Sequence, residues 1–110
     1  MTKSEQEVFA KAIEEYGRQN QLIVLFEEMS ELQKEVCKSV RYKTSKSILA
    51  HIAEEIADVS IMLDQTKMMF NISDEDVEGW RLDKVVRLRE RLGLAPMLIP
   101  DKGDDYVERV

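Results

Sequence analysis

The fold is decided by the stretch from Asn20 to Tyr42, which reads NQLIVLFEEMSELQKEVCKSVRY. Its apolar residues recur at alternating spacings of three and four, at Leu22, Leu25, Met29, Leu32 and Val36. That period is typical of one face of an α-helix. The stretch holds no proline or glycine to interrupt a helix. We therefore expect a helix over about residues 20–42, with the apolar stripe as its core face.

Two further helices are expected on either side of this one. The capping-box pattern Ser4-x-x-Glu7 predicts a first helix that runs to about Tyr16, and Gly17 would stop it. A third helix should follow the polar segment 43–47 and run to about residue 70. Its core face would be the stripe formed by Ile52, Ile56, Val59 and Leu63.

A fourth helix is expected to begin after Ser73, because three acidic residues follow it and suit a helix N-terminus. It would run to about Leu92 and be capped by Gly93. No strand pattern competes with these helices. The sequence therefore predicts an all-α bundle of about four helices over residues 1–93, and a C-terminal arm or tail over residues 94–110.

Composition limits the class of protein. The chain has 110 residues, 44% of them hydrophobic, and a formal net charge of −6. No apolar run approaches the length needed to span a bilayer, and the polar N-terminus lacks the apolar core of a signal peptide, so we expect a cytoplasmic protein that does not bind membranes. The net charge argues against duplex nucleic acid as a partner. A divalent cation could still join acidic side chains to the phosphates of a nucleotide.

An acidic motif occurs twice, 27 residues apart. The segment from Leu25 to Leu32, LFEEMSEL, matches the segment from Ile52 to Val59, IAEEIADV, almost position by position. In each copy the second glutamate and the last acid are three residues apart, so they lie on the same side of a helix. Each pair borders an apolar stripe. If the two stripes pack together, four carboxylates converge: Glu28, Glu31, Glu55 and Asp58.

Convergent carboxylates repel one another unless a positive charge lies between them. A hard divalent cation is the natural partner, and Mg²⁺ prefers oxygen ligands. The alternative is a solvated charged face, which should hold basic partners one turn away. Lys34 and Lys38 follow the first motif, but no basic residue follows the second before Lys67. We therefore expect a metal site.

These residues resemble a known family, the MazG-like members of the all-α nucleoside triphosphate pyrophosphohydrolases. The family pattern is E-E-x-x-E followed by E-x-x-D, which this chain carries as Glu27-Glu28-x-x-Glu31 and Glu55-x-x-Asp58. The resemblance covers roughly residues 20–90. It implies a catalytic domain over residues 1–93, and Mg²⁺, for which Mn²⁺ can substitute, held by the four convergent acids. It also implies cleavage of an NTP or dNTP between the α- and β-phosphates to give NMP and pyrophosphate.

Other residues are weaker candidates. By the same resemblance, Glu27 or Glu54 would be an outer carboxylate that orients or deprotonates the attacking water. Lys84 and Arg87 share a face of the fourth helix and would bind phosphate, although a solvated basic face is the alternative. Trp80 could stack on a base, or pack in the core or against a second copy. His51 precedes Glu55 by one turn but has the wrong order for a di-iron motif.

The sequence is compatible with three hypotheses about function. The first is the Mg²⁺-dependent pyrophosphohydrolase. The second is a non-catalytic acidic helical interaction module, and the third is a metal-dependent hydrolase of another phosphorylated compound. Because a chain this short leaves apolar edges, we expect a homodimer or homotetramer.

Overall fold

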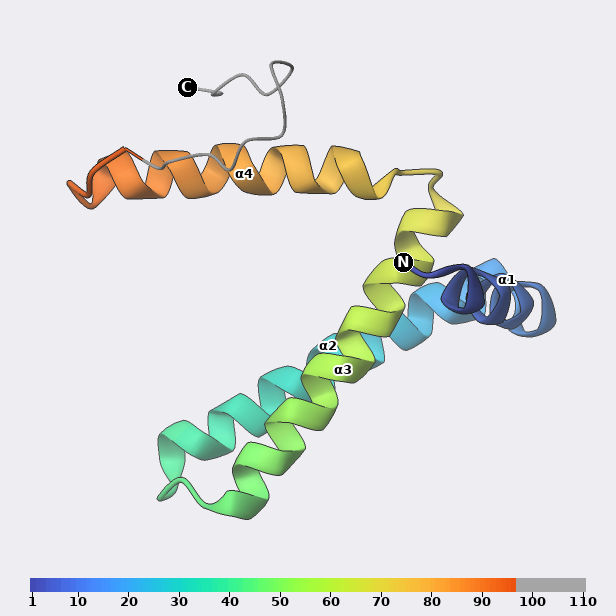
Figure 1. Cartoon of the computed structure of the whole chain (residues 1–110). Coiled ribbons are helices and arrows are strands. Elements are labelled where there is room, and N and C mark those ends of the chain that lie inside the picture. Colours follow the sequence, from blue (N-terminus) through green and yellow to red (C-terminus); the bar gives the residue numbers. More distant parts are fainter. Residues whose placement is uncertain (97–110) are drawn as a thin grey trace. The chain divides into compact units, whose positions relative to one another are not determined.

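The computed structural model describes residues 1–96, and over that range the chain forms four α-helices and no strand. They are α1 (Lys3–Tyr16), α2 (Arg18–Arg41), α3 (Lys46–Met69) and α4 (Asp74–Arg91) (Figure 1). The predicted all-α class is confirmed. None of the described helices is apolar enough over a sufficient length to cross a bilayer.

The helix ends follow the expected chemistry with one correction. The capping box of α1 is formed by Thr2 and Glu5, and not by Ser4 and Glu7. The Glu5 backbone N–H donates to Thr2 Oγ1 at 3.0 Å, and the Thr2 backbone N–H donates to Glu5 Oε1 at 2.8 Å. Thr2 takes this role because it lies just before the first helical residue with an extended backbone. Gly17 ends α1 as predicted, and Ser73 caps α4 through a 3.0 Å bond from the Asp76 amide.

The chain divides into two compact units, Met1–Ile72 and Ser73–Val110. The first unit holds α1, α2 and α3, and the second holds α4. Asn71, with a φ of 54°, lies at the end of the first unit. The tail predicted over residues 94–110 lies outside the described residues from residue 97 onward.

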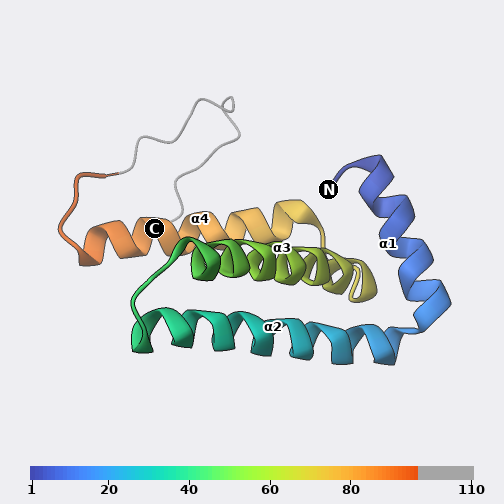
Figure 2. The same ribbon diagram turned by 90° about the horizontal axis from the view of Figure 1, so that it is seen from below.

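The first unit is an antiparallel helical hairpin with a third helix across it. α2 and α3 pack side by side along their length, and α1 contacts both of them (Figures 1 and 2). Figure 2 shows α1 beside the end of the hairpin where α2 begins and α3 ends. Phe9 is the buried anchor of α1. The four-residue connection Tyr42–Ser45 joins the two long helices.

The α2–α3 interface is built from one heptad row of each helix, which we call the inner seam. Its positions are Gln21, Leu25, Glu28, Leu32 and Glu35 on α2, and His51, Glu55, Asp58, Met62 and Gln65 on α3. All of them are buried or half-buried except His51. Alternating spacings of three and four keep such a row on one side of a helix.

The predicted core face is therefore wrong in part. On α3, Ile56 and Leu63 are 53% and 48% exposed, and on α2 Met29 and Val36 are also exposed. On α3 the predicted stripe lies one residue after the inner seam, which corresponds to a rotation of about 100° around the helix. On α2 the predicted stripe shares Leu25 and Leu32 with the inner seam, so only part of it faces α3. Acidic and amide side chains therefore share the contact between α2 and α3 with a few apolar residues.

Candidate metal centre

Three polar layers cross the inner seam at intervals of seven residues. Gln21 meets Gln65, Glu28 meets Asp58, and Glu35 meets His51. In each pair the two residue numbers have the same sum, as expected for two antiparallel helices in one fixed register. The middle layer contains the carboxylates that the twinned motif provides.

The two outer layers contain their own partners. Gln21 Nε2 donates a buried 2.7 Å hydrogen bond to Gln65 Oε1. At the other end, Lys38 Nζ lies 2.9 Å from Glu35 Oε1, and His51 Nδ1 lies 3.8 Å from Glu35 Oε2. The Lys38 contact lowers the pKa of Glu35, and the charges of Lys38, His51 and Lys34 add to this effect. Glu35 Oε2 is itself buried without a hydrogen bond, but Lys38 and His51 lie beside this carboxylate.

The middle layer lacks such partners. One carboxylate oxygen each from Glu28, Glu55 and Asp58 can be chosen so that all three lie within 4.8 Å of one another. Among the described residues, no Lys, Arg or His forms an ion pair with any of the three. Glu55 Oε2 is buried and accepts no hydrogen bond. An uncompensated carboxylate oxygen of this kind is rare in folded proteins and costs free energy.

The crowded carboxylates of the middle layer have shifted pKa values. Burial raises the pKa of Glu28, and the charges of Asp58 and Glu55 raise it further. Burial likewise raises the pKa of Glu55, followed by the charges of Asp58 and Glu31. The common cause is a set of like charges held together away from water. A bound cation would relieve both effects.

Of the four predicted ligands, the structure brings three together. Glu31 is exposed and lies outside the triad of Glu28, Glu55 and Asp58, although its charge raises the pKa of both glutamates in that triad. Glu27 and Glu54, the predicted proton acceptors, are exposed residues that directly precede Glu28 and Glu55. Glu54 is close enough to contribute to the raised pKa of Glu55.

The donor set fits Mg²⁺. All three donors are carboxylate oxygens from half-buried side chains on two rigid helices. Mg²⁺ favours such hard ligands and keeps waters in its remaining positions. His51 pairs with Glu35 and does not join this group, so the centre offers no nitrogen ligand of the kind that favours zinc or iron.

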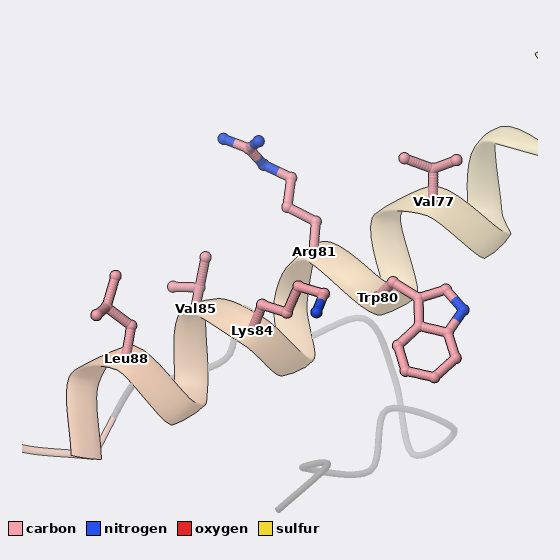
Figure 3. Close-up of a pocket in the computed structure, with 6 residues that line it drawn as sticks. All are labelled: Val77, Trp80, Arg81, Lys84, Val85 and Leu88. Atoms are coloured by element: carbon pink, nitrogen blue, oxygen red, sulfur yellow. The ribbon is translucent and has the colours of Figure 1, made fainter. Parts of the chain in front are cut away.

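The candidate substrate residues lie on α4, in the second compact unit. Trp80 and Lys84 line an open groove of about 470 Å³ together with Val77, Arg81, Val85 and Leu88, all on α4 (Figure 3). Arg87 is exposed on the same helix but does not line the groove. Trp80 is 61% exposed, so it is not a core residue of the described chain. Phosphate binding by Lys84 and Arg87, and base stacking by Trp80, stay predictions.

The glutamine layer was not predicted from the sequence. Gln21 lies seven residues before Glu28, and Gln65 lies seven residues after Asp58. Those heptad intervals place both amides in the seam that contains the acids, and this spacing was the signal available in the sequence.

We compared the chain with protein-family models, with curated proteins and with solved structures. None of the three comparisons gives a match. The assignment of function therefore depends on the geometry of the centre and on the motif that builds it.

Proposed function

We propose that the protein is a Mg²⁺-dependent nucleoside triphosphate pyrophosphohydrolase that converts an NTP or dNTP to NMP and pyrophosphate. One observation carries the proposal: Glu28, Glu55 and Asp58 lie within 4.8 Å of one another between two polar layers that are internally paired. The resemblance of the twinned acidic motif to the MazG-like pattern supports the choice of reaction.

The chain's own residues supply most of what this reaction needs. Glu28, Glu55 and Asp58 would hold the cation, and Glu31, one turn from Glu28, would be a fourth ligand. When bound, Mg²⁺ supplies an acidified water and offsets charge on the phosphate oxygens. Glu27 and Glu54 are exposed beside the triad, where either carboxylate can accept the proton of the attacking water. No side-chain nucleophile is required.

The substrate residues predicted on α4, in the second compact unit, are a separate part of the proposal. Lys84 and Arg87 would bind the phosphates, and Trp80 would stack on the base. Their exposure on α4 leaves these side chains available for a ligand. Assembly as a homodimer or homotetramer in the cytoplasm, with no duplex nucleic acid or membrane as partner, belongs to the same proposal.

The test is pyrophosphate release from a panel of NTPs and dNTPs. We expect turnover with Mg²⁺ or Mn²⁺ and none with EDTA. Glu55→Gln should lose nearly all activity while keeping its helical circular dichroism, because the amide removes one anionic ligand without changing the side-chain size. Glu7→Gln, an exposed site on α1, is the matched control and should keep full activity.

Two outcomes would contradict the proposal in different ways. If the folded protein binds Mg²⁺ but releases pyrophosphate from no nucleotide, a different phosphorylated substrate or a non-catalytic interaction module is favoured. If Mg²⁺ does not bind at all, the metal centre itself is wrong.

A further inference from the structure

The end of the hairpin where α2 is joined to α3 carries a concentration of positive charge. This end lies away from α1 (Figure 2). All 22 Asp and Glu residues of the protein lie outside the stretch from Val36 to Ala53, which covers the end of α2, the connection Tyr42–Ser45 and the first two turns of α3. The basic residues within that stretch are Lys38, Arg41, Lys43 and Lys46. A chain with a net charge of −6 therefore presents one strongly basic segment.

Three of these four cations are available for a ligand. Lys38 is engaged, because its Nζ lies 2.9 Å from Glu35 Oε1. Arg41, Lys43 and Lys46 are exposed, and within residues 1–96 none of them forms an ion pair. Because Arg41 and Lys46 are only five residues apart, their Cα atoms lie within about 18 Å of each other. We call Arg41, Tyr42, Lys43 and Lys46 the basic tip.

Helix stability accounts for only part of this charge. Arg41 lies in the last turn of α2, where a positive charge suits the helix dipole. Lys46 is instead the first residue of α3, at the end of a helix that favours negative charge, and the first turn of α3 contains no acid. Ser45 Oγ accepts from the Ile48 amide at 3.2 Å, so the amides of Lys46 and Ser47 point out of the helix end. An anion at the basic tip would be attracted by the lysine side chain and by these amides.

Tyr42 adds an aromatic ring to the same surface. Its side chain is 65% exposed, and its backbone is extended, with a φ of −120° and a ψ of 162°. Exposed aromatic rings among cations are typical of surfaces that bind single-stranded nucleic acid, because a base stacks on the ring while the cations contact phosphates. An acidic peptide would pair with the cations and leave the ring without a partner. The combination therefore favours a nucleic acid strand over an acidic protein segment.

We propose that the basic tip binds single-stranded nucleic acid, with Arg41, Lys43 and Lys46 at phosphates and Tyr42 stacked on a base. A duplex is disfavoured, because its bases are already stacked and its larger charged surface would approach the acidic remainder of the chain. The contact is therefore limited to a few nucleotides.

The basic tip is separate from the metal centre. Arg41 lies 13 residues after Glu28, which corresponds to about 20 Å along α2. The layer formed by Glu35 and His51 lies between them. A strand at the tip would thus bind without a metal ion, and the inference does not depend on the reaction proposed above.

The test is the fluorescence anisotropy of a labelled thymidine strand of about 12 nucleotides, titrated with the full chain in EDTA. Three phosphate contacts should make the affinity fall about 20-fold between about 50 and 200 mM salt. Lys43→Gln with Lys46→Gln should weaken binding about ten-fold at the lower salt concentration. With one contact left, the salt effect should shrink to about three-fold.

The matched control is Lys3→Gln with Lys11→Gln, which removes the same charge from exposed positions of α1 and should bind like the wild type. Tyr42→Leu should weaken binding at least about five-fold and leave the salt dependence unchanged, because stacking involves no phosphate. Circular dichroism checks that each variant keeps its helices.

Several results would overturn the proposal. The first is a wild type that does not bind the strand at the lower salt concentration. The second is equal weakening by the two lysine pairs, which would mean that binding follows net charge and not the tip. Unchanged affinity in Tyr42→Leu would remove the stacking contact. A duplex or an oligoglutamate of the same length that binds as tightly as the strand would show that the ligand class is wrong.

Discussion

Glu28 on α2 and Glu55 on α3 each place a carboxylate oxygen within 4.8 Å of the other's, and neither glutamate forms an ion pair with a basic residue in the described part of the chain. Burial raises the pKa of Glu28, and the charges of Asp58 and Glu55 raise it further. Burial also raises the pKa of Glu55, followed by the charge of Asp58. A cation that binds at this centre would therefore exchange with protons.

The stability of the metal-free protein should reflect this exchange. Both glutamates have folded pKa values above the ordinary value of 4.5, so the folded state binds more protons than the unfolded chain. Their contribution is fully present below pH 4.5 and is lost as pH rises through the raised values. In EDTA, the melting temperature of the wild type should fall over that range, and Glu28→Gln with Glu55→Gln should remove this fall.

Glu35 acts in the opposite direction and provides an internal comparison. Its pKa is lowered, so its contribution is present above 4.5 and is lost as pH falls through the lowered value. Lys38→Met should reduce the loss of stability on the acidic side while leaving the fall above pH 4.5 in place. The glutamine double variant and Lys38→Met should therefore change stability on opposite sides of pH 4.5. If both change it on the same side, the assignment of the two pH ranges to the two layers is wrong.

Magnesium should reverse the pH dependence above 4.5. Ligand carboxylates must be deprotonated, so cation affinity rises with pH. At a Mg²⁺ concentration of about 100 times the dissociation constant, the wild type should gain about 2.7 kcal/mol. Thermal unfolding in a Mg²⁺ titration at pH 7.5 is the measurement. Asp58→Asn should gain much less, and Glu14→Gln on α1 should gain as much as the wild type.

The buried glutamine pair should behave as a coupled unit. Gln65→Leu removes the acceptor of the 2.7 Å bond and leaves the Gln21 amide buried without it, which costs about 1–3 kcal/mol. Gln21→Leu with Gln65→Leu replaces both amides with apolar groups and should recover most of that loss. Urea unfolding of the two single variants and the double variant measures the coupling. Additive losses would show that the pair is not coupled.

Gly17 should resist substitution for a backbone reason. Its φ of 90° and ψ of 146° lie in a region that side chains with a Cβ rarely adopt, and an added Cβ would meet no atom within 4 Å. Gly17→Ala should therefore cost about 1–3 kcal/mol through backbone strain and not through a clash. Urea unfolding checks the loss, and unchanged stability would mean that the connection between α1 and α2 relaxes freely.

Much of the fold could be predicted from local chemistry. Gly17 and Ser73 marked helix ends because of their backbone and capping preferences, and both predictions are confirmed. The regular spacing of apolar residues correctly predicted the two long helices. The sequence pattern predicts the capping box of α1 two residues after its actual position, because Thr2 and Ser4 both precede a glutamate by three residues. Only the extended backbone at Thr2 separates the two choices.

The rotation of the two long helices could not be predicted in the same way. On α3 the inner seam and the predicted apolar stripe have the same period, and the apolar stripe is the better candidate for a core if the chain is considered alone. The structure instead turns Glu55 and Gln65 toward α2 and leaves Ile56 exposed. Burying acids and exposing apolar side chains are both unfavourable in an isolated chain. A bound cation would remove the first penalty and a second copy the second, and neither is part of the isolated chain.

The two copies of the acidic motif contribute unequally to the centre. Glu28 and Glu55, which are 27 residues apart and occupy the same place in the motif, both lie in the triad. Asp58, the last acid of the second copy, also lies in the triad, whereas its counterpart Glu31, which is one methylene longer, remains exposed outside it. The carboxylates of the centre therefore come from two residues of α3 and one of α2. An unsymmetrical ligand bound there would meet a different set of charges from each helix.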